Sequence, residues 1–244
     1  MSPVATIPSA VKSGLNDQEV ETRLAAVEKL AQLKELPEPP FDEMLELLRE
    51  RAGTDDDRDV RNAAYEAKRP VAIVRGRRRG LRNPRPNTMD MAKFGDRELV
   101  WKAIEIVWDA VSIYDGPEML DAGLKLATRG QTALYAVWWT QSEVRNGGFY
   151  QYFDNPTGIV VEYARDGFKY IGANDLASVV ERAMSRFPKG HPPLEQAVRR
   201  RALQKLGPKP LDGIDDEFYR HTDSLFSLGA KCVRDNLGDF FELP

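Results

Sequence analysis

The sequence predicts an all-α protein, and three observations lead to this prediction. Apolar side chains recur at intervals of three and four residues through most of the chain, which is the spacing that gathers them on one face of a helix. No segment alternates apolar and polar residues between hairpin turns, as a half-buried strand would. Of the 244 residues, 42% are hydrophobic and 30% are charged, so the chain has the composition and length to bury a sizeable core.

Charge and cysteine content exclude some function classes. The 35 basic and 38 acidic residues leave a net charge of -3, which argues against a uniformly basic nucleic-acid binder and against a strongly acidic protein. The single cysteine, Cys232, cannot form an internal disulfide, and its helical spacing from Leu225 and Gly229 favours a buried thiol over a nucleophile. No secretory signal and no bilayer-length apolar run are visible, so we expect a cytoplasmic protein without membrane contact.

Residues 1–69 are expected to form a short helical segment with an internal repeat. An R-x-A-A tetrapeptide begins at Arg23 and again at Arg61, 38 positions later, and Asp17 is matched by Asp55 at the same interval. Apolar residues at helical spacing accompany each copy, and a further amphipathic helix is expected between them. A period near 40 built from helices resembles the HEAT repeat. The alternative is a small helical hairpin that rests on the next domain.

Residues 70–93 are predicted to be an arginine-rich linker. They hold seven basic residues and one acidic residue, interspersed with Pro70, Gly80 and Pro84. Like charges among helix breakers favour an extended segment. Such a segment is a candidate for sequence-independent nucleic-acid contact, because its cations would neutralise phosphates. The candidate contact residues are Arg75, Arg77, Arg78, Arg79, Arg82 and Arg85.

Residues 94–244 are predicted to form a multi-helix globular domain. Apolar stripes predict helices within 99–113, 120–127, 133–146, 160–168, 176–187 and 218–232. The third is the most apolar and is expected to be the central helix, ending at the paired glycines Gly147 and Gly148. Asn174 or Asp175 is expected to cap the helix within 176–187, and Asp215 is expected to cap the last helix.

The most distinctive stretch of the sequence covers residues 141–158. In it Phe149, Tyr152 and Phe153 follow helical spacing, and several polar side chains lie beside these rings. Buried polar groups must find hydrogen-bond partners. Two interpretations are open at this point: a polar staple that fixes the angle between two helices, or the lining of a small ligand cleft.

No catalytic grouping is found in the sequence. His191 lies in a proline-rich loop and His221 in a predicted helix, and neither has a Cys, Asp or Glu at the spacing of a zinc site. Nucleophile-elbow, phosphate-loop and dinucleotide-binding motifs are not found either. We therefore expect a non-enzymatic protein with no cofactor and no metal, and an uncharacterised enzymatic or small-ligand site at the 141–158 stretch remains an alternative.

The same stretch resembles the signature of a bacterial family of uncharacterised helical domains, typified by the C-terminal domain of a DNA-mimic protein. The family pattern is an acidic residue before N-G-G-F, then x-Q-Y/F-F-x-N and a glycine. The similarity continues over residues 97–241. The matching residues of the motif are Glu143, Asn146, Gly147, Gly148, Phe149, Gln151, Tyr152, Phe153, Asn155 and Gly158.

The resemblance implies a self-associating domain, for example a homodimer, that displays carboxylates in place of DNA phosphates and binds a DNA-binding transcription regulator. Such a surface would require acidic residues segregated from basic ones. We therefore expect a protein–protein interaction protein, with direct nucleic-acid binding only through the arginine-rich linker. The candidate acidic face comprises Asp212, Asp215, Asp216, Glu217 and Asp223.

Overall fold

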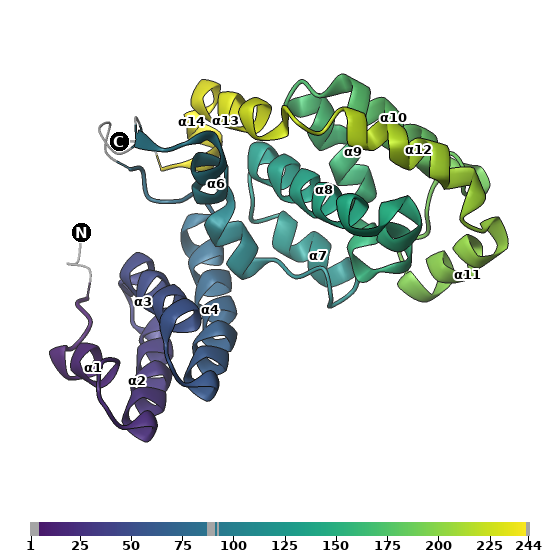
Figure 1. The fold of residues 1–244 in the computed structure, drawn as a ribbon. Helices are drawn as coiled ribbons and strands as arrows, with labels where there is room; N and C mark the ends of the chain where they lie inside the picture. Colours follow the sequence, from purple (N-terminus) through teal and green to yellow (C-terminus); the bar gives the residue numbers. More distant parts are fainter. Residues whose placement is uncertain (1–4, 87–90, 92, 243–244) are drawn as a thin grey trace. The chain divides into compact units, whose positions relative to one another are not determined.

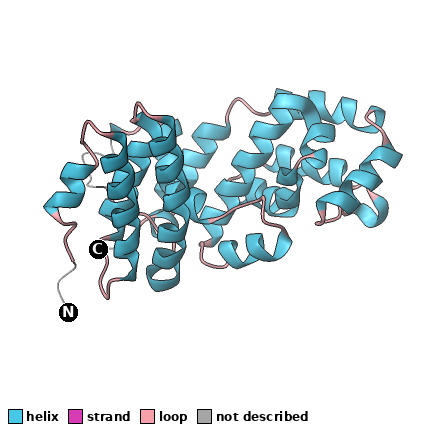
Figure 2. Cartoon of the chain, turned by 90° about the horizontal axis from the view of Figure 1, so that it is seen from below, coloured by secondary structure: helices cyan, strands magenta, loops and turns pink. Residues whose placement is uncertain are grey.

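The protein is all-α, as the sequence predicts. A computed structural model describes residues 5–86, 91 and 93–242, and Figure 2 shows helices and loops throughout these residues. Within the described part, the pairing of Asn83 with Phe241 is an isolated β-bridge and no strand forms. The chain divides into two compact units: the first runs to Leu81 and includes Asp109–Val111, and the second comprises Arg82–Trp108 and the chain from Ser112 onward.

Four α-helices make up most of the first unit. Helix α2 packs against α1 and α4, and α3 packs against α4 (Figure 1). Their inward stripes are fully buried, for example Leu30, Leu48 and Val60. Helix α4 starts where the side chain of Asp57 accepts two backbone N–H groups of the first turn. The elements are α1 (Ser9–Gly14), α2 (Val20–Gln32), η1 (Leu33–Glu35), α3 (Phe41–Thr54) and α4 (Arg58–Arg79).

The two copies of the 38-residue sequence repeat form the same set of hydrogen bonds in the turns before α2 and α4. Arg23 Nη1 donates to the backbone oxygens six and five positions before it, at 2.9 and 3.1 Å. Arg61 Nη1 does the same at 2.7 and 2.9 Å. Asp17 and Asp55 each accept the backbone N–H two positions ahead. The turns that lead into α2 and α4 are thus stabilised in the same way, while the HEAT assignment itself stays a prediction.

The predicted linker is wrong for residues 70–79, which form the C-terminal part of α4 even though Pro70 lies inside this helix. Like charges do not unwind the helix because several of them have partners. Arg75 is fully buried and donates to the carboxylate of Asp42 at 2.8 Å and to the carbonyl of Gly80 at 2.9 Å. Arg78 donates to two backbone oxygens of the loop before α3. Residues 87–90 and 92 of the predicted linker lie outside the described residues.

The second unit is built around α8. This helix contacts α9, α11, α12, α14 and the turn η2, and Figure 1 shows it among them. Its N-cap is Thr128, whose hydroxyl and backbone form a reciprocal capping box with Gln131. The elements of this unit are α6 (Asp96–Ala110), α7 (Pro117–Leu124), α8 (Arg129–Asp154), η2 (Pro156–Val160), α9 (Val161–Tyr170), α10 (Asn174–Met184), η3 (Pro188–Gly190), α11 (Gln196–Leu206), α12 (Lys209–Arg220), α13 (Leu225–Asp235) and α14 (Leu237–Phe240).

Two sequence predictions about helix boundaries are corrected here. The helix expected within 218–232 is broken, because α12 ends at Arg220 and α13 begins at Leu225. In the break, the buried Thr222 donates its hydroxyl to the carbonyl of Tyr219 at 3.1 Å, a local bond that competes with helix continuation. The residue at the N-cap of α10 is Ala173, so neither Asn174 nor Asp175 caps it.

Candidate functional site

The N-G-G-F motif marks a sharp bend within α8. Gly147 and Gly148 leave the helical conformation, with φ/ψ of -161/25° and 72/178° respectively, and the helix resumes directly at Phe149. The positive φ of Gly148 lies where side chains are rarely tolerated. The helix end expected at these glycines is therefore present, but a second helical segment follows it without a connecting loop.

Asp215 of α12 caps this second segment. Its Oδ1 accepts the backbone N–H of Phe149 at 2.7 Å, and its Oδ2 lies so close to Gly148 that a Cβ there would overlap it. Burial raises the pKa of Asp215, and the nearby carboxylates of Asp212 and Asp216 raise it further, against the opposing effect of the Phe149 hydrogen bond. The sequence predicted a capping role for Asp215, but assigned it to the last helix instead of to the bend of α8.

The aromatic residues of the motif are part of the core. Phe149, Tyr152 and Phe153 are fully buried, and Phe149 packs edge-on against Phe218 of α12 with ring centroids 5.4 Å apart. The hydroxyl of Tyr152 shares a 2.8 Å hydrogen bond with Thr140, and burial raises the pKa of this phenol. These rings fasten both segments of α8 to the surrounding helices and offer no reactive group to a ligand.

The polar residues of the motif hold the bend in place. Asn155 donates its side-chain amide to Glu143 at 2.7 Å, which ties the two segments of α8 together across the bend. The side chain of Gln151 folds over Gly147, where a Cβ would overlap it, and Asn146 is exposed. This arrangement favours the polar staple over the ligand cleft.

Arg199 of α11 is the residue that the sequence interpretation missed. It is fully buried and donates to five backbone oxygens, three of which follow one another closely at the end of α8 and the start of η2. Burial lowers the pKa of its guanidinium. Gly158 is needed beside it, because a Cβ there would approach Arg199 Nε to 2.8 Å. Arg199 thus caps the C-terminus of α8 as Asp215 caps the segment after the bend.

The predicted acidic face is divided by the structure. Asp212, Asp216 and Asp223 are exposed. Glu217 is held by Arg182 of α10 at 2.5 Å, and this ion pair lowers its pKa. Because Asp215 is turned toward the bend of α8, it does not contribute a free carboxylate to this face. The carboxylates that remain available to a partner are those of Asp212, Asp216 and Asp223.

The candidate nucleic-acid contacts also differ in burial and in hydrogen bonding. Arg75 is buried and therefore unable to reach a phosphate, which corrects its assignment. Arg78 and Arg82 are exposed, but each donates to backbone oxygens, Arg82 to that of Gly238 at 2.6 Å. Arg77, Arg79 and Arg85 are exposed. The six arginines do not form the continuous extended segment that the sequence suggested.

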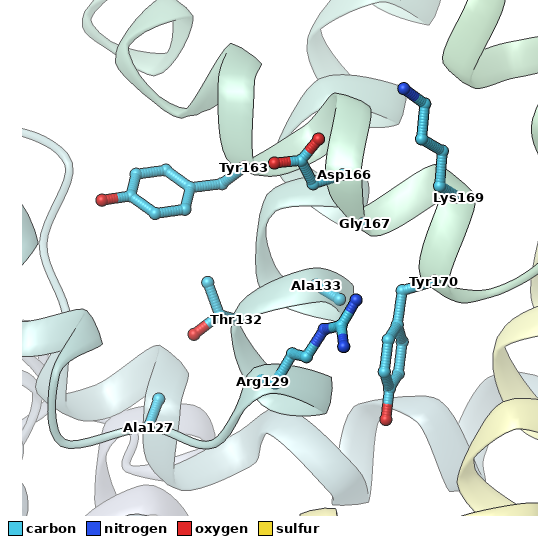
Figure 3. A pocket seen from close by; sticks show the side chains of 9 residues that line it. All are labelled: Ala127, Arg129, Thr132, Ala133, Tyr163, Asp166, Gly167, Lys169 and Tyr170. Carbon is cyan, nitrogen blue, oxygen red and sulfur yellow. The ribbon is translucent and has the colours of Figure 1, made fainter.

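A cavity of about 410 Å³ opens beside α8 and α9 and contains none of the predicted site residues. Figure 3 shows the side chains of Arg129 and Tyr170 extended next to each other, and the guanidinium lies 5.2 Å from the ring centroid. The hydroxyl of Tyr170 donates to Asp239 at 2.7 Å. No sequence pattern marks this cavity, because its lining comes from two separate segments: Ala127, Arg129, Thr132, Ala133, Tyr163, Asp166, Gly167, Lys169 and Tyr170.

No group of three or more His, Cys, Asp or Glu side chains is placed to hold a metal ion in the part of the chain that the structure describes. Among the helices described, none combines the length and the apolar character that a bilayer span requires.

Comparison with known families agrees with the resemblance found in the motif. No curated protein and no solved structure matches the chain significantly. Residues 125–236 match the model of a family described as DMP19-like protein. The matched segment contains the bend of α8, the Arg199 cap and the acidic helix α12. The part of the chain that these contacts organise is therefore similar to DMP19-like proteins.

Proposed function

We propose that this protein is a non-enzymatic protein–protein interaction protein that binds a DNA-binding regulator in the manner of a DNA mimic. The observation that carries the proposal is the DMP19-like match over residues 125–236, which includes all of α12. On this helix the exposed carboxylates would take the place of phosphates in the partner's basic site.

The local charge of α12 supports this role. Asp212 and Asp216 lie four residues apart on the helix, so they project from the same side about 6 Å apart along its axis. Both are exposed, and both contribute to the raised pKa of Asp215. The two carboxylates therefore add local negative charge at this part of α12. A cationic partner surface would be attracted to it.

The experiment is affinity capture from nuclease-treated lysate with the tagged full-length chain, followed by mass spectrometry and competition with duplex DNA. We expect a nuclease-resistant DNA-binding protein that duplex DNA displaces. The double variant Asp212→Asn/Asp216→Asn should weaken this binding, because it removes two of the three free carboxylates of the face. Added salt should weaken the binding of the unmodified chain as well.

The matched control is Glu98→Gln/Glu118→Gln, which removes two exposed carboxylates from α6 and α7. It changes the net charge by the same amount and should leave binding intact. Equal losses of binding in both double variants would mean that binding depends on the net charge of the chain and not on the carboxylates of α12. Captured material that disappears on nuclease treatment would contradict the proposal and favour nucleic-acid contact through the exposed arginines.

A further inference from the structure

The first unit consists of two helical layers joined by a charged contact. We call α1 with α2 the first layer and α3 with α4 the second. Arg23 of the first layer uses Nη1 for its own turn, and its Nη2 reaches the second layer, where it pairs with Asp55 at 3.1 Å and Asp56 at 2.6 Å. The side chains of Arg23 and Asp55 are almost entirely buried in this contact.

The second layer ends with counterparts of these groups that meet no further layer, and the ring of Tyr65 is contacted by the ammonium of Lys68 on its own helix, 4.7 Å from the ring centroid. Arg61, the counterpart of Arg23, employs Nη1 for its own turn, but Nη2 has no partner among the described residues. Tyr65 is the counterpart of Val27, and it is 66% exposed whereas Val27 is 2% exposed. Farther along α4, Lys68 is already held by Asp109 at 3.2 Å. The open part of this face, which we call the Arg61 face, therefore comprises Arg61 and Tyr65.

The first layer has the complementary end. Asp17, the counterpart of Asp55, is exposed and has no cationic partner among the described residues. Next to it, α1 and α2 enclose a groove of about 390 Å³ lined by Ala10, Val11, Gly14, Glu21, Thr22, Ala25, Ala26 and Lys29. We call this the Asp17 face. On α4 the counterparts of Thr22 and Ala26 are Val60 and Ala64, which are fully buried.

We propose that two copies of this chain associate end to end, with the Arg61 face of one copy on the Asp17 face of the next. The contact between the two layers of one chain serves as the template: Arg61 would meet Asp17 as Arg23 meets Asp55, and Tyr65 would enter the groove. A second copy is favoured as the occupant because the chain carries both halves of the contact, with opposite charge and matching repeat positions. Such a contact joins two different faces, so it can extend beyond a dimer.

The test is sedimentation equilibrium of the full chain over a wide concentration range at low and high salt. We expect the average mass to rise with concentration and to fall with salt. Tyr65→Asp should weaken the association at least about tenfold, as loss of a central aromatic contact does at interfaces. Arg77→Asp changes the charge by two units on an exposed residue of the same helix, about four turns from Arg61 and on another side of the helix, and should have no such effect.

A charge exchange makes the test specific for the pairing. Arg61→Asp and Asp17→Arg should each abolish self-association, and an equimolar mixture of the two should restore it, because the unmodified Arg61 of one variant meets the unmodified Asp17 of the other. Circular dichroism checks that both variants remain folded, because Arg61→Asp and Asp17→Arg each also lose hydrogen bonds of their own turn. A chain that stays monomeric at every concentration overturns the proposal. Association that is indifferent to Tyr65→Asp, or mixing that fails to restore association between folded variants, overturns it as well.

Discussion

Asp215 caps a helix to which it does not belong: its carboxylate on α12 accepts the backbone N–H of Phe149 at the bend of α8. The bend requires such a group, because the N–H groups that follow Gly148 begin a new helical segment and have lost their usual acceptors. One side chain therefore couples the shape of α8 to the position of α12. Since α12 also carries Asp212 and Asp216, the bend determines where the acidic face of the proposed interaction lies.

Asp215→Ala should lower the free energy of unfolding by about 1 to 2 kcal/mol at neutral pH, because it removes a partly buried cap. Asp215→Asn keeps an oxygen acceptor and should cost less. Asp216→Ala, an exposed change on the next residue, serves as the control and should stay within about 0.5 kcal/mol of the unmodified chain. Urea unfolding followed by circular dichroism measures all three. A loss in Asp216→Ala equal to that in Asp215→Ala would contradict the capping role.

The raised pKa of Asp215 predicts a pH dependence with a definite sign. Burial, aided by Asp212 and Asp216, raises this pKa above the ordinary value of 3.8, so the folded chain holds the proton more tightly than the unfolded chain. The resulting stabilisation is complete below pH 3.8 and is lost as the pH rises through the raised pKa. Relative to Asp215→Asn, which does not titrate, the free energy of unfolding should therefore fall across this window. A pH-independent difference between the two proteins would contradict the prediction.

Gly148→Ala tests the bend itself. The substitution combines a backbone strained at φ 72° with an overlap between the new Cβ and the carboxylate of Asp215. Gly172→Ala is the matched control, since Gly172 has φ 83° but no neighbour within 4 Å, so it carries the backbone strain alone. We expect Gly148→Ala to be more destabilising than the control, which should cost roughly 1 kcal/mol or more.

A double variant separates the two contributions at Gly148. In an Asp215→Ala background the overlap is gone, so Gly148→Ala should cost less than it does in the unmodified chain. Thermal unfolding of the four proteins in this cycle gives the interaction free energy directly. Strict additivity would mean that Asp215 and Gly148 do not act on each other.

Most of the helices could be predicted from the sequence because their apolar stripes contain the required information, but α11 and most of α12 fell outside the expected helices. The paired glycines correctly predicted a helix end. The sequence did not indicate that the next helical segment starts at once, because its cap is Asp215, which lies 66 positions away in the chain. The linker prediction was wrong over residues 70–79 for a related reason. Arginine charges favour an extended segment only when they are unpaired, and the partner of Arg75 is Asp42, which lies 33 positions earlier in the chain.

Arg199 could not be found in the sequence at all. Its acceptors are backbone carbonyls, which every residue carries, so no partner residue type marks them. The repeat in the first unit is the opposite case. There Arg61 and Asp55 recur at the spacing of Arg23 and Asp17, and the structure repeats their hydrogen bonds. Side chains that bond within a local turn leave a sequence signal, and those that bond to a distant backbone do not.

Arg199→Ala should be the most destabilising of these substitutions, with a loss of about 3 to 5 kcal/mol, because it leaves buried carbonyls at the end of α8 without their donor. Arg199→Lys keeps the charge, but its single ammonium cannot reach all the oxygens that the planar guanidinium serves, so an intermediate loss is expected. Arg200→Ala is the control on the neighbouring residue: Arg200 is exposed and pairs with Asp154 at 2.8 Å, and its removal should cost no more than about 1 kcal/mol. Denaturant unfolding of the full chain measures the free energy of unfolding of each variant. The signal is followed at several wavelengths so that the transition of the second unit is recorded. Equal losses for Arg199→Ala and Arg200→Ala would mean that the guanidinium of Arg199 adds nothing beyond a surface ion pair, and the end of α8 would then need another explanation for its buried carbonyls.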